Sequence, residues 1–151
     1  MAADAADGVC IVDTDATVEQ FLRIAVIRAD AVLVVVEPYF KSLETGRRMA
    51  RLGRLQGYEH VALVANKVRD EHDAVYRFAE EHELEVAGVI PYDDRLPASE
   101  WAQSAPLDFD PQTPAIAAID ALARRLVEDS GRANGRRDGG PPGDQAGPAS
   151  T

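Results

Sequence analysis

Apolar positions along the chain alternate between two spacings, one typical of buried strands and the other of amphipathic helices. Short, nearly continuous apolar runs predict strands at Val9–Val12, Ala31–Val36, Val61–Ala65 and Val86–Ile90. Apolar side chains three or four residues apart predict helices that start near Val18, span Ser42–Gln56 and Asp73–His82, and start again at Pro114. Strands that alternate with single helices predict an α/β fold, a parallel sheet with helices on both faces.

Polar and small residues mark the ends of these elements. Ser42 and Thr113 are expected as N-caps, and Gly57 as a helix stop. Residues 92–112 contain three prolines and are expected to be irregular. From residue 130 onward the chain has no large apolar side chain, which predicts disorder. We therefore expect an N-terminal extension over residues 1–7, one folded domain over 8–129 and a disordered tail over 130–151.

Composition and charge exclude several classes of protein. The 151 residues carry a formal net charge of −10, which argues against nucleic acid or an anionic membrane as a partner. The single cysteine, Cys10, allows no internal disulfide. The start of the sequence lacks the features of a signal peptide, and the longest apolar run is far shorter than the roughly 20 residues that span a bilayer. A cytoplasmic protein is the expectation.

The residues that follow the predicted strands are the candidates for ligand binding, because ligands of such sheets bind beyond the carboxyl ends of the strands. Asp13 suits a carboxylate that holds magnesium through water, or equally an ordinary carboxylate at a helix N-terminus. Asn66 suits an amide that contacts a base edge, or a residue that caps a turn. Arg47, Arg51 and Arg54 form a stripe on one predicted helix, either a solvated face or an anion site.

Four stretches in order resemble the MinD/ParA-type P-loop ATPases, and within them most of all the CooC-like ATPases that serve nickel insertion into carbon monoxide dehydrogenase. The stretches are VDTDATVEQFLR (12–23), ADAVLVVVEPYFKSLETGRR (29–48), VALVANKV (61–68) and GVIPYDDRL (88–96). The resemblance implies the carboxyl-terminal portion of a SIMIBI-type P-loop NTPase fold over residues 8–129.

Particular residues take roles from this resemblance. Asp13 corresponds to the Walker B aspartate near magnesium, and the switch that senses the γ-phosphate corresponds to Thr14, Asp15, Ala16 and Thr17. Asn66 and Lys67 correspond to the base-recognition pair. The loop that lines the base corresponds to Pro91, Tyr92 and Asp93. The implied cofactors are ATP or ADP with magnesium.

The chain also departs from the family pattern. The glycine-rich segment G-K-G-G-x-G-K-[ST], whose backbone amides and lysines bind phosphates, does not occur in the 151 residues. Thr17 stands where the switch has glycine, and the metal-binding Cys-x-Cys of the CooC-like proteins is missing. These departures predict weak or absent binding of ATP and magnesium, and no ATPase activity of this chain alone.

Several functions stay open at this stage. The chain is expected to be a CooC/MinD-like nucleotide-binding-fold protein without its phosphate loop. One alternative is a truncated gene model of an active maturation or positioning ATPase. Another is a non-catalytic subunit, in a homo-oligomer or in a heterodimer with a P-loop-bearing ATPase. A receiver or flavodoxin-like domain ranks low, because receivers need an aspartate where the chain has Asn66-Lys67.

Overall fold

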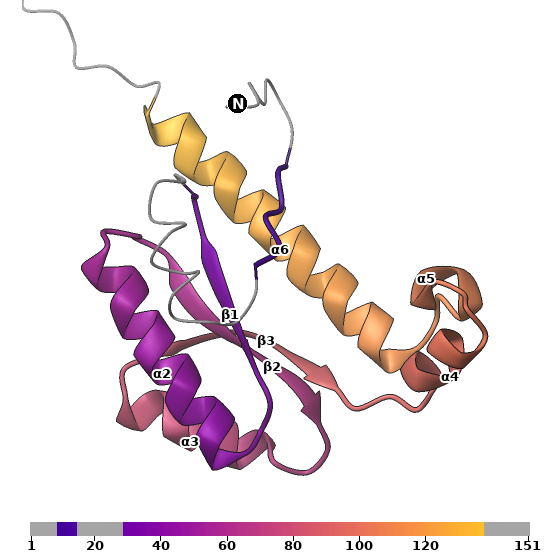
Figure 1. Cartoon of the computed structure of the whole chain (residues 1–151). Coiled ribbons are helices and arrows are strands. Elements are labelled where there is room, and N and C mark those ends of the chain that lie inside the picture. The colour runs from indigo at the N-terminus through magenta and orange to yellow at the C-terminus, as the bar shows by residue number, and fades with distance from the viewer. Residues whose placement is uncertain (1–8, 15–28, 138–151) are drawn as a thin grey trace, which may run out of the picture.

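A three-stranded parallel sheet forms the centre of the molecule (Figure 1). The structure is a computed structural model that describes residues 9–14 and 29–137, with side chains as far as Asp129. The strands lie in the order β1 (Val32–Val36), β2 (Val61–Val68) and β3 (Glu85–Pro91). The predicted α/β fold with a parallel sheet is confirmed for these strands.

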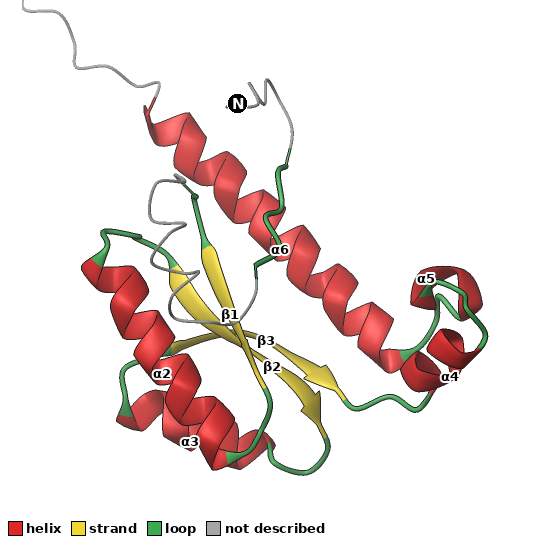
Figure 2. Cartoon of the chain, viewed as in Figure 1, coloured by secondary structure: helices red, strands yellow, loops and turns green. Residues whose placement is uncertain are grey.

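Helices cover both faces of the sheet, as predicted (Figure 2). On one face, α2 (Phe40–Leu55) and α3 (His72–Glu81) pack on a core that includes Leu63 and Ala65. On the other face, α6 (Pro114–Arg137) packs on a core that includes Ala62 and Val64. Successive strand side chains point to opposite faces, so the apolar stretch Val61–Ala65 of β2 contributes to both cores.

The prediction of a strand at Val9–Val12 is wrong. These residues form no regular element, and Val9 and Ile11 are 70% and 86% exposed. A parallel strand depends on ladder hydrogen bonds and on cover over both faces, and apolar sequence alone supplies neither. The helix predicted from Val18 lies outside the described residues.

Helix α2 begins two residues earlier than predicted, at Phe40, with Tyr39 as N-cap. The hydroxyl of Ser42 does not cap the helix. It accepts a hydrogen bond from the backbone N–H of Glu37, at 2.9 Å, and so joins the end of β1 to the first turn of α2. Gly57 ends the helix as expected, because its φ of +88° is open to glycine without strain.

The connection predicted to be irregular contains two short helices, α4 (Arg95–Trp101) and α5 (Pro106–Phe109). Pro97 and Pro106 lie in the first turns of these helices, where a backbone N–H has no helical partner, so proline costs little there. The prolines therefore indicated helix starts, and the interpretation of this segment as irregular was wrong.

The last helix starts as predicted and ends later. The hydroxyl of Thr113 accepts a hydrogen bond from the backbone N–H of Ile116, at 3.3 Å, as an N-cap does. Helix α6 continues to Arg137, beyond the predicted end of the folded domain at residue 129. A helix extends through its own backbone hydrogen bonds, so a lack of apolar side chains does not end it. None of the helices in the described part of the chain is long and apolar enough to cross a membrane.

Candidate functional site at the carboxyl ends of the strands

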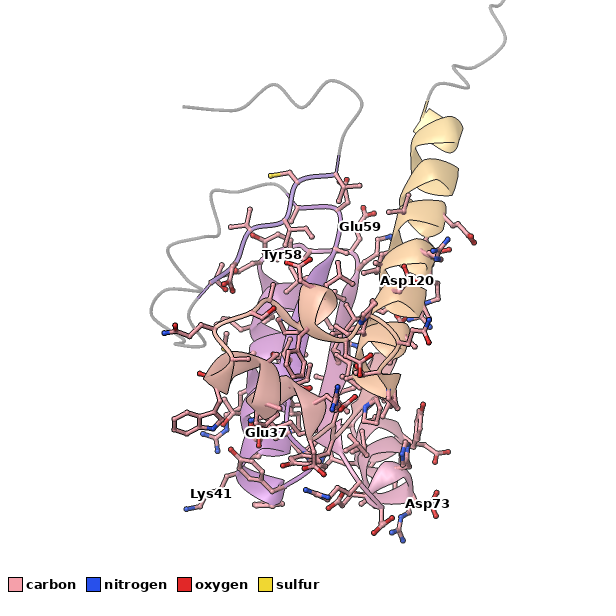
Figure 3. The ribbon with its side chains drawn as sticks, turned by 90° about the vertical axis from the view of Figure 1, so that its right-hand side faces the viewer. Glu37, Lys41, Tyr58, Glu59, Asp73 and Asp120 are labelled. Atoms are coloured by element: carbon pink, nitrogen blue, oxygen red, sulfur yellow. The ribbon has the colours of Figure 1, made fainter. Side chains whose placement is uncertain are left out.

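The carboxyl ends of the three strands bring together the side chains of one cluster. This carboxyl-end cluster consists of Glu37, Asn66, Lys67, Arg69 and Tyr92. Figure 3 shows Glu37 toward the same end of the molecule as Lys41 and Asp73, and Tyr58 and Glu59 at the opposite end.

A β-bulge positions the predicted base-recognition pair. Between Ala65 and Val68 the register of β2 against β3 shifts. The chain advances by three residues on β2 over the length in which it advances by two residues on β3. Lys67 lies within this bulge with a φ of +57°, which is uncommon for a residue with a side chain. Bulges and such backbone conformations concentrate at functional sites, where they redirect side chains.

Lys67 connects two strand ends. Its Nζ lies 2.9 Å from Oε1 of Glu37 at the end of β1, and its backbone N–H donates to Oδ1 of Asn66 at 2.9 Å. The hydrogen bond from Lys67 to Glu37 and the negative charge of Glu37 raise the pKa of Lys67 above its usual value. The ammonium group is therefore charged at neutral pH and ties the bulge of β2 to the end of β1 through Glu37.

An aromatic contact closes the other side of the cluster. The guanidinium carbon of Arg69 lies 3.5 Å from the centre of the Tyr92 ring, which is a cation–π contact. The backbone N–H of Tyr92 donates to the carbonyl of Val68, at 2.8 Å. Arg69 thus covers one face of the ring. Sequence reasoning missed Arg69, because an arginine one residue beyond a strand carries no signal of the ring it will meet.

Asp93, predicted to line the base, has its carboxylate committed elsewhere. The carboxylate oxygens accept hydrogen bonds from the backbone N–H groups of Arg95, at 2.9 Å, and Ala115, at 3.2 Å. The pKa of the Asp93 carboxyl lies below its usual value, mainly because of the hydrogen bond from the backbone N–H of Arg95. The hydrogen bonds from the backbone N–H of Ala115 and from the side chain of Thr113 lower it further. The buried carboxylate therefore stabilises the first turns of α4 and α6.

Of the predicted magnesium residue and its switch, the structure describes only Asp13 and Thr14. Asp13 and Thr14 are exposed and follow no strand. Asp15, Ala16 and Thr17 lie outside the described residues. Within the ranges that the structure describes, no group of three or more His, Cys, Asp or Glu side chains is placed to hold a metal ion. The described residues thus offer an amide to a base, at Asn66, and no cluster of three such groups to a metal ion.

Comparison with known proteins identifies relatives by sequence and by fold. No family profile matches the chain. It is 37% identical over 106 residues to an uncharacterised ATP-binding protein of Methanocaldococcus jannaschii, covering 69% of this chain and 41% of that protein. It is 27% identical to the carbon monoxide dehydrogenase accessory protein CooC of Rhodospirillum rubrum, covering 77% of this chain and 45% of CooC. The chain thus spans less than half of these relatives.

Solved structures of similar fold are cell division proteins. The MinC:MinD complex of Aquifex aeolicus matches with a TM-score of 0.62 and 26% identity, over 74% of this chain and 48% of that one. MinD of the same organism matches with a TM-score of 0.57 and 25% identity, over 66% of this chain and 44% of that one. These similarities show that the chain is related to the MinD/ParA-type P-loop ATPases, with CooC and MinD among its relatives.

Proposed function

We propose that this chain supplies the base side of an adenine-nucleotide site at the carboxyl-end cluster. The observation that carries the proposal is the position of Asn66, half-buried on a β-bulge with its Oδ1 held by the N–H of Lys67. The amide keeps its N–H donors and an acceptor lone pair for a ligand, which matches the donor and acceptor on the edge of adenine. The ATP-binding relative supports this choice of ligand.

The phosphate side of the site is expected to come from outside these 151 residues. Phosphates are bound by glycine-rich backbone and lysine at a helix N-terminus, and the sequence has no such segment. The chain by itself therefore binds ATP or ADP weakly, independently of magnesium, and hydrolyses neither. Another part of a longer polypeptide or a P-loop-bearing partner would complete the site.

The test compares adenosine, ADP and ATP in calorimetric titrations, each with and without magnesium. We expect weak binding of all three through the base, with no requirement for magnesium. Asn66→Ala should weaken adenosine binding about tenfold, the effect of losing hydrogen bonds to a ligand. The matched control is Gln112→Ala, which removes an exposed amide before α6 and should change nothing. Release of phosphate from ATP, or adenosine binding that survives Asn66→Ala, would contradict the proposal.

A partner is the second part of the proposal. One solved structure of similar fold is a complex of MinD with MinC, so association is within the reach of this fold. In this chain β1 is an edge strand of the described sheet, and Val35 on it is 61% exposed. Exposed apolar side chains on an edge strand favour pairing with another chain. We propose that the chain forms a homo-oligomer or a heterodimer with a P-loop-bearing ATPase.

The cytoplasmic location of the protein stays a prediction.

A further inference from the structure

A hollow lined by basic side chains lies apart from the carboxyl-end cluster. It is lined by Arg47, Arg51 and Arg54 of α2 and by His82 and Leu84 of the α3–β3 connection, and it encloses about 210 Å³. Helices α2 and α3 run over the same face of the sheet (Figure 1), so the hollow opens on that helical face. The arginine stripe of the sequence is therefore one wall of a concave surface. None of the five lining residues is acidic, although the chain as a whole carries −10.

Two of the three guanidinium groups are held in place by protein contacts. Nε and Nη2 of Arg47 donate to the two carboxylate oxygens of Glu44, at 2.8 and 2.7 Å. Nη2 of Arg54 donates to the backbone carbonyl of Glu83, at 2.9 Å, which connects α2 to the opposite wall. A guanidinium has five N–H donors, so Arg47 and Arg54 keep three and four for a ligand.

The side of the hollow that His82 and Leu84 form is also held by packing contacts. The ring of His82 packs edge-on against Phe78, with ring centres 4.5 Å apart. Leu84 is half-buried and packs on the core beneath α2 and α3. Arg51, between the two held arginines, is exposed and makes no side-chain hydrogen bond or ion pair with the part of the chain that the structure describes. Its guanidinium is thus available to an anion.

We propose that this hollow binds a small phosphorylated ligand through the guanidinium groups of Arg47, Arg51 and Arg54. The planar fork of N–H donors on arginine matches the oxygen geometry of a phosphate, and two arginines held in advance lose little freedom on binding. The hollow of about 210 Å³ is smaller than the roughly 300–1,000 Å³ of typical small-molecule pockets, which favours one or two phosphoryl groups over a whole nucleotide. The site is separate from the proposed base site and does not depend on it.

The experiment titrates inorganic diphosphate and, separately, adenosine into the full chain. We expect diphosphate to bind, more weakly as salt rises, and the double variant Arg51→Gln/Arg54→Gln to weaken it about tenfold or more, since each charge-assisted hydrogen bond contributes strongly. Arg124→Gln, on α6 across the sheet, removes one positive charge away from the hollow and should leave diphosphate binding within about twofold. Circular dichroism and thermal unfolding establish that each variant is folded.

The two proposals fail in distinguishable ways. Asn66→Ala should weaken adenosine and leave diphosphate unchanged, and the arginine variant should do the reverse. The proposal for the hollow is overturned if diphosphate does not bind at concentrations up to roughly 10 mM, a range that covers weak affinities. It is also overturned if the arginine variant and Arg124→Gln weaken diphosphate equally, or if only an acidic peptide binds. Parallel titrations with inorganic phosphate and with ATP show whether the hollow binds a free phosphate ion or the phosphates of a nucleotide.

Discussion

The carboxylate of Asp93 accepts a hydrogen bond from the backbone N–H of Ala115, at 3.2 Å, across 22 residues of sequence. The same carboxylate accepts from the N–H of Arg95. One buried side chain therefore serves the starts of two helices and ties α6 to the end of β3. The packing of the last helix on the sheet is oriented by this contact as well as by apolar side chains.

Replacement of Asp93 should destabilise the protein. In Asp93→Ala the N–H groups of Arg95 and Ala115 lose their acceptor, and we expect the midpoint of thermal unfolding to fall by several degrees, as for the loss of a helix cap. The neighbouring Asp94 is exposed, so Asp94→Ala is the matched control and should unfold close to the wild type. Equal midpoints for the two variants would show that the carboxylate does not hold the helices.

The pH dependence of stability should report on the same residue. The pKa of Asp93 is lower in the folded protein than its ordinary value. The stabilisation it supplies is therefore complete above the ordinary pKa and is lost as pH falls through the folded value. Unfolding midpoints measured from pH 7 downward should drop more steeply for the wild type than for Asp93→Asn below about pH 4. Parallel curves for the two proteins would contradict this origin.

Glu44 offers a second, direct measurement of pKa. Its carboxylate accepts hydrogen bonds from Arg47 and Arg48, and these two arginines lower its pKa to about 2. A carboxyl-detected NMR titration should therefore find Glu44 ionised well below pH 4. In Arg47→Gln/Arg48→Gln the pKa should return toward its ordinary value of 4.5. An unchanged pKa of Glu44 in this double variant would contradict the two arginines as the cause.

Gly46 should not tolerate a larger side chain. It is buried where α2 crosses β1, and a Cβ at this position would overlap Cγ1 of Val36. Gly46→Ala should lower the free energy of unfolding by about 1–3 kcal/mol, the usual cost of overpacking a core. The exposed Thr45→Ala on the same helix should change it by less than about 0.5 kcal/mol.

A double variant tests the cause of that loss. Val36→Ala removes the methyl group that the new Cβ would meet, so Gly46→Ala/Val36→Ala should be more stable than the sum of the two single effects predicts. Chemical denaturation supplies all four free energies. If the changes in the free energy of unfolding of the two single variants simply add in the double variant, the contact with Val36 is not what destabilises Gly46→Ala.

Association through the edge strand can be measured by sedimentation over a range of concentrations. We expect self-association of the wild type to weaken in Val35→Lys, because a charge on an edge strand opposes pairing with another chain. Val127→Lys adds the same charge at a similarly exposed position on α6 and should have no effect. A wild type that stays monomeric at every concentration would rule out the homo-oligomer and leave the heterodimer.

The sequence by itself determined the order of β1, α2, β2, α3, β3 and α6, the parallel sheet and its two covered faces, because apolar spacing is a local property that the burial of each strand and helix imposes. It also predicted that Asn66, Lys67 and Tyr92 would lie at one edge, since parallel strands end together. It erred at Val9–Val12, where apolar residues find neither a neighbouring strand nor cover in the described structure. Apolar sequence is necessary for a buried strand and not sufficient.

Only the tertiary structure decided how the polar side chains pair. Asp93 turns to cap α6 rather than facing a ligand, Lys67 reaches Glu37 thirty residues away, and Arg69 covers Tyr92. It also turned the arginine stripe of α2 into the wall of a hollow by placing His82 and Leu84 opposite. Such contacts join residues far apart in the chain, and their partners depend on strand register and helix placement, which no local pattern specifies.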